Sequence, residues 1–392
     1  MSPAPDQSSF EGTAPNMLGA VEQPVMSEGP QPGPTSGRAT GRAAEPSGKA
    51  GEVISGEPTS HDGEALSCAP LPAAGPHGGD GARVAAALGI SDVLDLSASM
   101  NPVAPDPGPV VARHLDALGR YPDAGPATAA LAAAMGVDVD RLLLTNGGAE
   151  AIALVAAETG PGWADACDFS LYRRHLPGLD PAGPRWRSDP HSPLGTLAGP
   201  EVTAEVWDEA FYPLATGRWT AGRSGFALGS LTKLLACPGL RVGYVLCPNG
   251  GVRERLAARQ PQWAVNGLAC AALAELLAPV DLPAWSAAIA ELRAELVVVL
   301  KAFGHRVRPD ATANWVLVDG DHDLRSRLAP HGVVVRDCTS FGLPGTHRIA
   351  VPAAKQLPSV AAALRLARVG EAPSLVAGWS QGPQGATGSG GA

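Results

Sequence analysis

The chain has 392 residues, of which 45% are hydrophobic and 17% are charged, so it is long enough to form one large domain or two medium ones. Its formal net charge of −9 and the lack of any Lys/Arg-rich run argue against a nucleic-acid-binding protein. No apolar stretch reaches the length of a membrane span and no secretory signal is visible, so we expect a cytoplasmic protein that does not bind membranes.

The cysteines are few for this length, and none of them forms a Cys-x-x-Cys pair. They are Cys68, Cys167, Cys237, Cys247, Cys270 and Cys338. We therefore expect reduced thiols, with neither a disulfide framework nor a metal site.

The two ends of the chain differ in composition from its middle. Residues 1–75 are rich in Gly, Pro, Ser, Ala and Glu and poor in large apolar residues, and residues 371–392 are similar. Such segments bury too little apolar surface to offset their ordering entropy, so we predict that both are disordered. Between them we predict a large domain at 76–265 and a smaller C-terminal domain at 266–370.

Helical and strand-like patterns alternate through this middle part. The predicted helices are 81–88, 128–135, 151–158, a helical region at 267–303, and 357–369. The predicted strands are 93–97, 141–145, 205–207, 225–229, 241–246, 314–318, 332–335 and 346–351. The alternation predicts an α/β fold with a mostly parallel sheet, followed by a smaller α+β lobe.

Two of the predicted strands end in residues suited to binding a ligand. The string Asn146-Gly-Gly-Ala-Glu150 joins a strand to a helix, and the free amides and dipole at a helix N-terminus favour an anion such as phosphate. Asp208 follows another strand, where an acid in an α/β sheet usually meets a ligand, and Glu209 is the competing candidate. Each feature alone is also common as a turn or a helix cap.

Lys233 is the residue whose type is most informative. The chain has only four lysines among 29 basic residues, and this one lies in Ser230-Leu-Thr-Lys-Leu-Leu-Ala-Cys-Pro-Gly-Leu-Arg-Val-Gly-Tyr244. A lysine can lose its proton and form a Schiff base, which an arginine cannot do. Ser230 and Arg241 can bind a phosphate, with the guanidinium offering two parallel hydrogen bonds.

These motifs, in this order, resemble the class I and II aminotransferases, which are fold-type I enzymes dependent on pyridoxal 5′-phosphate (PLP). Within them the chain is most similar to the histidinol-phosphate aminotransferase-like branch and to the threonine-phosphate decarboxylases of cobalamin biosynthesis. The other residues that carry the resemblance are His77–Asp80, Leu94–Pro102, Tyr121–Asp123, Phe169–Tyr172, Asp208–Phe211, Gln262–Asn266 and Val335–Phe341.

The resemblance implies a role for each matching residue. Lys233 would form the Schiff base and move the proton, and Asp208 would pair with the pyridine nitrogen. The remaining cofactor residues would be Gly148, Ala149, Ser230 and Arg241 at the phosphate, Phe169 on the ring, Asp189 near the ring oxygen, and Tyr121 at the cofactor of the neighbouring subunit in a homodimer. The substrate residues would be Arg348 at the carboxylate, Arg336 at a phosphate or second anion, and His77 and Asn101.

The chain departs from the family pattern at two places. Related proteins carry Asn-Pro-x-Asn-Pro-Thr-Gly where this chain has Asp189-Pro-His-Ser-Pro-Leu-Gly195, and an ionised Asp cannot donate the hydrogen bond expected of the Asn. Asp189 is therefore protonated, or turned away, or part of an altered site. The stretch from Phe169 to Asp189 is also short and rich in proline, which predicts a trimmed sheet edge. Related aminotransferases often carry a tyrosine at the position of Phe211.

Three functions follow from these residues. In the first, Lys233 removes the Cα proton of an amino acid and transamination follows; in the second, the substrate loses CO₂ as in threonine-phosphate decarboxylases. In the third, the altered segment leaves a PLP-fold protein that only binds or regulates. No Gly-x-x-x-x-Gly-Lys-Ser/Thr string supports a simple nucleotide-binding protein.

Overall fold

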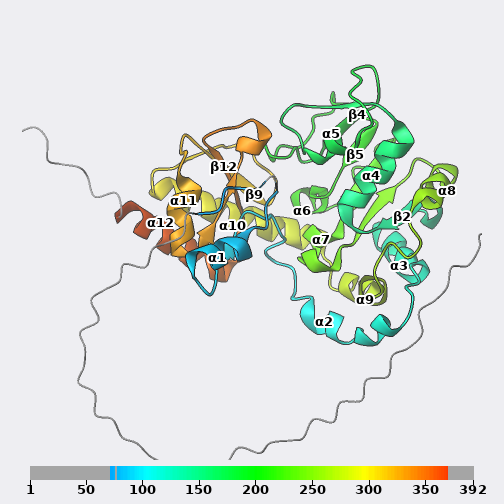
Figure 1. Cartoon of the computed structure of the whole chain (residues 1–392), viewed down its shortest axis with the longest axis horizontal. Coiled ribbons are helices and arrows are strands. Elements are labelled where there is room, and N and C mark those ends of the chain that lie inside the picture. The colour runs from blue at the N-terminus through cyan, green and yellow to red at the C-terminus, as the bar shows by residue number, and fades with distance from the viewer. Residues whose placement is uncertain (1–70, 76, 370–392) are drawn as a thin grey trace, which may run out of the picture. The chain divides into compact units, whose positions relative to one another are not determined.

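The computed structural model describes residues 71–75 and 77–369 (Figure 1). The predicted disordered segments therefore lie outside the described residues, except for residues 71–75. In that short stretch the carbonyl oxygens of Pro72 and Gly75 accept hydrogen bonds from Arg325 (2.8 Å) and Arg336 (2.6 Å). Residues 71–75 therefore contact the C-terminal elements, although the prediction placed them in the disordered N-terminal segment.

The larger sheet has six strands in the order β2-β7-β6-β5-β4-β3. Their bounds are β2 (Leu142–Thr145), β3 (Trp163–Ala164), β4 (Arg185–Ser188), β5 (Val206–Asp208), β6 (Phe226–Ser230) and β7 (Gly243–Leu246). Strands β3 to β6 are parallel, whereas β7 is antiparallel to both of its neighbours. The predicted α/β fold with a mostly parallel sheet is confirmed.

Alternating side chains along the strands bury both faces of this sheet. On one face Leu142, Leu144 and Tyr244 pack with α3 (Gly125–Met135) and α9 (Gly267–Leu277). On the other face the intervening residues Leu143 and Val245 pack with a second set of helices. These helices are α4 (Gly147–Thr159), α5 (Leu171–His175) and α8 (Gly250–Arg259). Helices therefore cover both faces of the sheet.

The parallel strands end at one edge of the sheet, and this edge carries polar residues. Ser188 at the end of β4 is in register with Asp208 at the end of β5, and Asp208 is in register with Leu228 of β6. Two residues further along, β6 ends at Ser230, which opens the short helix α7 (Leu231–Leu234). The sheet thus brings residues distant in sequence to a common edge.

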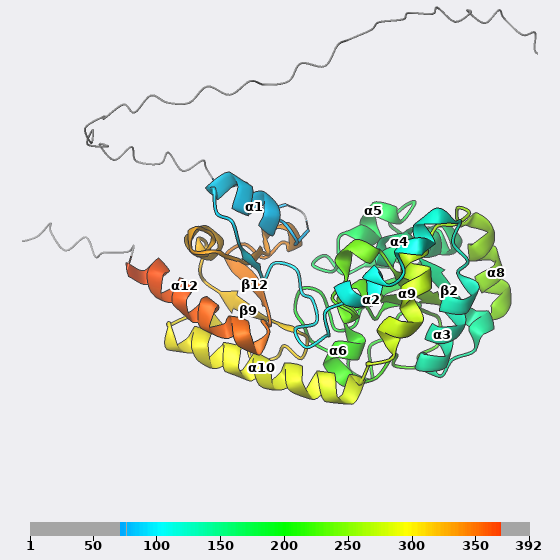
Figure 2. The same ribbon diagram turned by 90° about the horizontal axis from the view of Figure 1, so that it is seen from below.

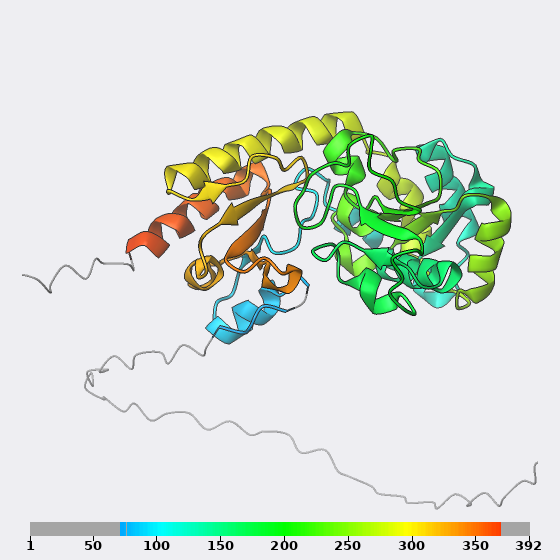
Figure 3. The same ribbon diagram turned by 90° about the horizontal axis from the view of Figure 1, so that it is seen from above.

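The second sheet has four antiparallel strands in the order β11-β12-β9-β8. Their bounds are β8 (Arg306–Val307), β9 (Trp315–Asp319), β11 (Arg336–Asp337) and β12 (Thr346–Ala350). One face packs under α10 (Leu282–Ala302) and α12 (Leu357–Val369), which lie along the same side of the sheet in Figure 3. The opposite face presents Trp315 and Leu317, in a cluster that also contains Phe341 and touches Phe211.

The N-terminal elements pack with this second group. Strand β1 (Leu94–Asp95) pairs in parallel with β10 (Val333–Val334), and Leu96 belongs to the apolar cluster of β9 and β12. The prediction placed this segment in the large domain, but its contacts are with the C-terminal elements. The domain division itself stays a prediction.

The predicted helical region at 267–303 is two helices. The break lies between α9 and α10, where the Asp281 carboxylate accepts a hydrogen bond from the Ala284 amide (3.0 Å) and caps α10. From there α10 extends along α6 (Tyr212–Thr216) and towards α12 (Figure 2). In the described part of the chain no single helix is long and apolar enough to cross a membrane. Helices α9 and α10 taken together reach the length and apolar composition of a membrane span, but they are bent by 88° at the break between them.

Three other α-helices lie in the described part of the chain. They are α1 (Gly81–Leu88), α2 (Gly108–Ala112) and α11 (Leu324–Leu328). Helix α1 contributes Val84 to a small apolar cluster with Ala329 and Val334, which attaches it to β10. It has the bounds predicted from the sequence.

Candidate active site

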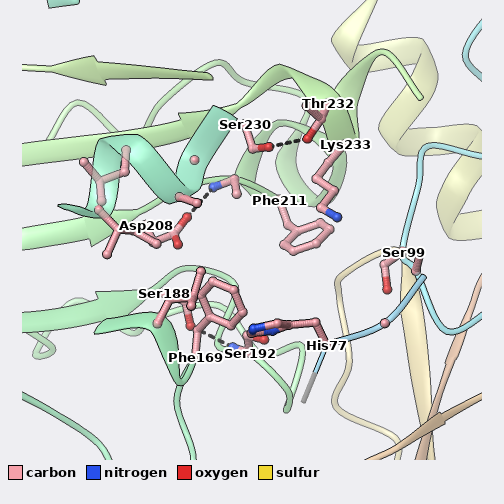
Figure 4. Close-up of a pocket in the computed structure, with 18 of the residues that line it drawn as sticks. His77, Ser99, Phe169, Ser188, Ser192, Asp208, Phe211, Ser230, Thr232 and Lys233 are labelled. Carbon is pink, nitrogen blue, oxygen red and sulfur yellow. Dashed lines mark hydrogen bonds between the residues drawn. The ribbon is translucent and has the colours of Figure 1, made fainter. Parts of the chain in front are cut away.

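A cavity of about 220 Å³ lies at the polar edge of the larger sheet (Figure 4). Ten of the thirteen predicted site residues line it, and three do not. The ten are His77, Gly148, Ala149, Phe169, Asp208, Ser230, Lys233, Arg241, Arg336 and Arg348. The structure therefore brings together residues predicted for the cofactor and residues predicted for the substrate.

The N-terminus of α4 forms one end of this cavity. Its N-cap residue, Asn146, makes no side-chain cap, so the amides of Gly148 and Ala149 remain for another acceptor. Gly147 has a φ of 75°, and a Cβ at that position would lie 2.5 Å from the Arg241 guanidinium. Only glycine therefore allows Arg241 to lie against the helix N-terminus, and the two together are suited to bind an anion.

Lys233 projects into the cavity from α7, facing the ring of Phe211 (Figure 4). Burial, together with the nearby cations Arg348 and Arg241, lowers the pKa of Lys233 to about 8. An ordinary lysine is almost fully protonated at neutral pH, whereas this amine is neutral in an appreciable fraction of molecules. Lys233 can therefore act as a nucleophile and as a base.

Asp208 enters the cavity from the end of β5. Its Oδ2 accepts a hydrogen bond from the Tyr172 hydroxyl (2.8 Å) and its Oδ1 accepts one from the Ala210 amide (3.0 Å). Burial raises the pKa of Asp208 to about 6, so the carboxylate is mostly ionised at neutral pH. The competing acid, Glu209, is buried outside the cavity, 3.5 Å from Arg223. Asp208 is thus the acid that a ligand meets.

Phe169 and His77 form the wall opposite Lys233 and Ser230 (Figure 4). Their rings meet edge to face with centroids 5.8 Å apart, and Phe169 meets Tyr172 in the same way at 5.7 Å. Burial and the positive charge of Arg336 lower the pKa of His77, which keeps this imidazole neutral at pH 7. The wall therefore offers a flat apolar surface to a ring.

Two arginines of the second sheet close the cavity. Arg348 is 8% exposed, lies over the rings of Trp315 and Phe341, and touches the Ser192 hydroxyl at 3.5 Å. No acid pairs with it among the described residues, and its Nε has no hydrogen-bond partner there. Burial lowers the pKa of Arg348 to about 10, so it stays charged at neutral pH and is suited to an incoming anion. Arg336 is bonded to the Gly75 carbonyl and to Ser340.

Asp189 does not line the cavity, which corrects the prediction that it lies beside the cofactor ring. Its carboxylate is fully buried on the far side of the turn, where it pairs with Arg223 at 2.6 Å and accepts a hydrogen bond from the Ala198 amide (2.9 Å). Arg223 also stacks on Trp207 at 3.9 Å. Of the three alternatives for Asp189, the structure shows that the side chain is turned away.

Ser192 lines the cavity in its place. It lies three residues after Asp189, and its backbone amide is bonded to the Ser188 hydroxyl (2.7 Å). The sequence pattern did not single out this serine, although the second Asn of the family string stands at its position. Tyr172 also lines the cavity, and no role was predicted for it. Its spacing of three residues from Phe169 is the signal that places both on one side of a helical turn.

Asn101 and Tyr121 also lie outside the cavity. The Asn101 side chain donates a hydrogen bond to the Leu234 carbonyl (2.9 Å), and the Asn101 backbone amide donates one to the Lys233 carbonyl (3.1 Å). Asn101 therefore anchors α7 and does not face the cavity. Tyr121 is 77% exposed and stacks on Trp263 with centroids 4.3 Å apart. Its implied role belongs to a second subunit and stays a prediction.

The short stretch from Trp163 to Ser188 keeps a strand, a helix and a strand in reduced form. Strand β3 has two residues and α5 has five, and the proline-rich stretch between α5 and β4 contains no helix or strand. The trimmed sheet edge is therefore present, yet Phe169 still reaches the cavity.

Comparisons with known proteins agree with this geometry. The profile of the family described as "Aminotransferase class I and II" matches residues 190–365. The threonine-phosphate decarboxylase of Salmonella typhimurium is 29% identical over 362 residues, covering 76% of this chain and 98% of that protein. The histidinol-phosphate aminotransferase of Moorella thermoacetica is 27% identical over 71% of this chain and 86% of its own length.

Solved structures show the same fold. The histidinol-phosphate aminotransferase of Sinorhizobium meliloti, in complex with PLP, superposes with a TM-score of 0.64 at 18% identity, over 76% of this chain and 96% of that one. The L-threonine-O-3-phosphate decarboxylase of Porphyromonas gingivalis gives 0.57 at 23% identity, over 68% and 97%. The predicted enzyme class and PLP as the cofactor are thus confirmed, and the chain is similar to the class I and II aminotransferases.

Proposed function

We propose that the chain is a PLP-dependent enzyme that acts on an amino acid or an amino-acid phosphate, with transamination as the first candidate reaction. The observation that carries this proposal is that Lys233, Asp208 and the N-terminus of α4 open into one cavity. These three features match an amine that reacts with an aldehyde, a partner for a pyridinium nitrogen, and a site for a phosphate.

The residues of the cavity fit PLP. The amides of Gly148 and Ala149, with Ser230 and Arg241, would hold the phosphate, and the Gly147 position admits no Cβ beside Arg241. Asp208 would hold the pyridine nitrogen, and Phe169 would cover one face of the ring. When bound, PLP supplies an aldehyde that reacts with amines and a ring that accepts electrons released at the substrate's Cα.

Lys233 and Asp208 have the charge states that this chemistry needs near neutral pH. With a pKa of about 8, the Lys233 amine can be both neutral and protonated near neutral pH. Its Nζ can therefore take a proton from the substrate's Cα and then donate that proton to another atom. With a pKa of about 6, Asp208 remains a carboxylate beside a positive ring nitrogen. Burial is the largest cause of both pKa shifts, and Arg348 and Arg241 add to the shift of Lys233.

Arg348 favours transamination over loss of CO₂. A carboxylate held by this buried guanidinium and by Ser192 is stabilised in its charged form, whereas decarboxylation removes that charge. The Cα–H bond is then the one for Lys233 to break. The second candidate is a threonine-phosphate decarboxylase. The support for it is the Salmonella relative, 98% of whose length is matched by this chain.

A substrate panel separates the candidates. The full chain loaded with PLP is mixed with L-glutamate, L-aspartate, L-histidinol phosphate or O-phospho-L-threonine. We expect an amino donor to convert the cofactor to its pyridoxamine form and to yield an oxo product, with no CO₂. Release of CO₂ from O-phospho-L-threonine supports the decarboxylase, and a chain that shows no absorbance band of bound PLP contradicts both and supports a binding or regulatory protein.

We also propose a homodimer, which would bring Tyr121 to the neighbouring subunit's cofactor. Large apolar side chains are exposed around it: Leu118 is 70% exposed, Leu115 54% and Trp263 55%. Light scattering should report a dimer for the wild type, and Leu118→Glu should shift it to monomer. Leu366→Glu, on an exposed position of α12, is the matched control. The location in the cytoplasm and a place in cobalamin biosynthesis stay predictions.

A further inference from the structure

Tyr172 is a buried side chain in the cavity wall to which the proposed reaction assigns no role. Its ring is fully buried between Phe169, which it meets edge to face at 5.7 Å, and Trp186 at 5.6 Å. These contacts place its hydroxyl 2.8 Å from Oδ2 of Asp208. The position of the hydroxyl is therefore determined by ring packing and not by the hydrogen bond alone.

Asp208 is held from two sides. The Ala210 amide, two residues along the chain, donates to Oδ1, and Tyr172 donates to Oδ2 from α5. The first contact is local and would survive many changes nearby. The second joins β5 to the short α5 segment, 36 residues away in sequence. Two donors on different oxygens fix the rotation of the carboxylate as well as its place.

The direction of the Tyr172 hydrogen bond is well determined. Burial raises the pKa of Tyr172, so its hydroxyl remains protonated and has one hydrogen to donate. The neighbouring hydroxyl of Ser188 donates to Oδ1 of Asp168, whose Oδ2 accepts the Ser188 amide (3.1 Å). Asp208 is therefore the acceptor for the Tyr172 hydrogen.

The charged and titratable groups around Asp208 come from several elements. Tyr172 of α5, Asp168 from the loop before it, Lys233 of α7 and Tyr244 of β7 all act on it or are acted on by it. Asp168 carries a like charge and disfavours the ionised form, whereas Lys233 favours it. Tyr172 is the only neutral side chain in this set that donates directly to the carboxylate among the described residues.

We propose that Tyr172 is a positioning residue that keeps Asp208 ionised and oriented toward the ring nitrogen of the bound cofactor. This inference rests on the proposed function. Tyr172 itself does not touch the reacting atoms. It acts through Asp208, and the proton it supplies stays on the phenol throughout.

The sign of the expected effect follows from these contacts. Burial raises the pKa of Asp208 and the Tyr172 hydrogen bond lowers it, so Tyr172→Phe raises that pKa further above its value of about 6. More of the carboxyl is then protonated at pH 6.5 than at pH 8.5. We expect PLP to bind the variant roughly tenfold more weakly than the wild type at pH 6.5, the size expected for one hydrogen bond to a charged group, and less so at pH 8.5.

The test is a double-mutant cycle read by PLP affinity, measured on the apo form of the full chain by fluorescence quenching. The four proteins are the wild type, Tyr172→Phe, Asp208→Asn and the double variant. The ring is kept in Tyr172→Phe, so its packing is retained, and the melting temperature checks this. Tyr244→Phe is the control for loss of another buried tyrosine hydroxyl from the same region.

The inference holds if Tyr172→Phe weakens binding in the wild type but has no effect in the Asp208→Asn background. It is overturned if the loss is the same in both backgrounds, because Tyr172 is then only structural, or if there is no loss at either pH. A wild type that does not bind PLP at all overturns the proposed function first, so the two failures are distinguishable.

Discussion

Two segments of the chain each contribute several residues to the cavity, and they are held in place by different means. The lysine segment, residues 226–246, runs through β6, α7 and β7, and its two strands pair with each other so that Ser230 lies opposite Gly243. Ser230, Lys233 and Arg241 are therefore placed by local backbone structure. Their spacing in the sequence is therefore almost enough to predict their positions in the structure.

The turn segment, residues 163–195, depends on distant partners. Tyr172 donates to Asp208, Asp189 pairs with Arg223, and Arg348 touches Ser192 across 156 residues. None of these contacts is implied by spacing. The comparison teaches that the lysine segment presents its polar residues to the cavity in a compact motif, whereas the turn segment is held by hydrogen bonds and a charge pair to distant residues.

The largest effect should come from the lysine segment. Lys233→Ala removes both the amine that reacts with PLP and the base, so we expect the absorbance band of bound PLP to vanish and kcat/KM to fall by roughly 10³-fold or more. Lys301→Ala, at an exposed lysine of α10, is the matched control. An unchanged absorbance band in Lys233→Ala would contradict the assignment of the lysine segment to the chemistry.

The turn segment should show its largest effect in stability. Arg223→Leu leaves the carboxylates of Asp189 and Glu209 buried without their cation, which we expect to lower the free energy of unfolding by about 3 kcal/mol. Urea unfolding measures this, and Arg218→Leu, at an exposed arginine nearby, should change it little. Equal effects of the two variants would mean that the buried pair does not hold the turn.

Much of the fold could be predicted from local pattern. Helix α1 has the predicted bounds, and strands β5, β6 and β7 lie within one or two residues of the predicted ranges, because each is an apolar run bounded by turn residues. The break between α9 and α10 was missed, since apolar residues continue through it and only Asp281 and the proline after it mark a new helix start.

The site divides in the same way. Residues that belong to the cavity through their own segment, such as Gly148 and Lys233, were found. Asp189 was misplaced and Ser192 missed because the choice between them depends on Arg223, a residue in another loop. Side-chain direction in a turn is decided by tertiary charge pairing, which a single sequence does not show.

A smaller effect should appear in the pH dependence of PLP capture. The neutral amine of Lys233 reacts, so the rate should rise with pH through about 8, and the fall of Asp208 ionisation should reduce PLP affinity below about pH 6. Arg348→Met removes a positive neighbour, which raises the pKa of Lys233 and moves the rate midpoint to higher pH.

Stopped-flow absorbance at a series of pH values measures this midpoint. Arg336→Met is the matched control, because Arg336 is not among the groups that lower the pKa of Lys233. A midpoint in Arg348→Met that stays at the wild-type value, or moves to lower pH, would show that Arg348 does not lower the pKa of this amine.

The smallest effect on PLP affinity is expected at Asp189, although the family pattern places this residue near the cofactor ring. Asp189→Asn restores the residue type of the family string, but the side chain faces Arg223 and the Ala198 amide and not the cavity. We therefore expect PLP affinity to stay within about threefold of the wild type, because an amide at a position that does not contact the ring adds no donor to it. The variant should instead lose about 1 kcal/mol of stability with the charge pair.

Fluorescence titration and urea unfolding of the same preparation separate these two quantities. A gain in PLP affinity of tenfold or more would mean that residue 189 faces the cofactor after all, and that the turn segment, like the lysine segment, is placed by its sequence pattern.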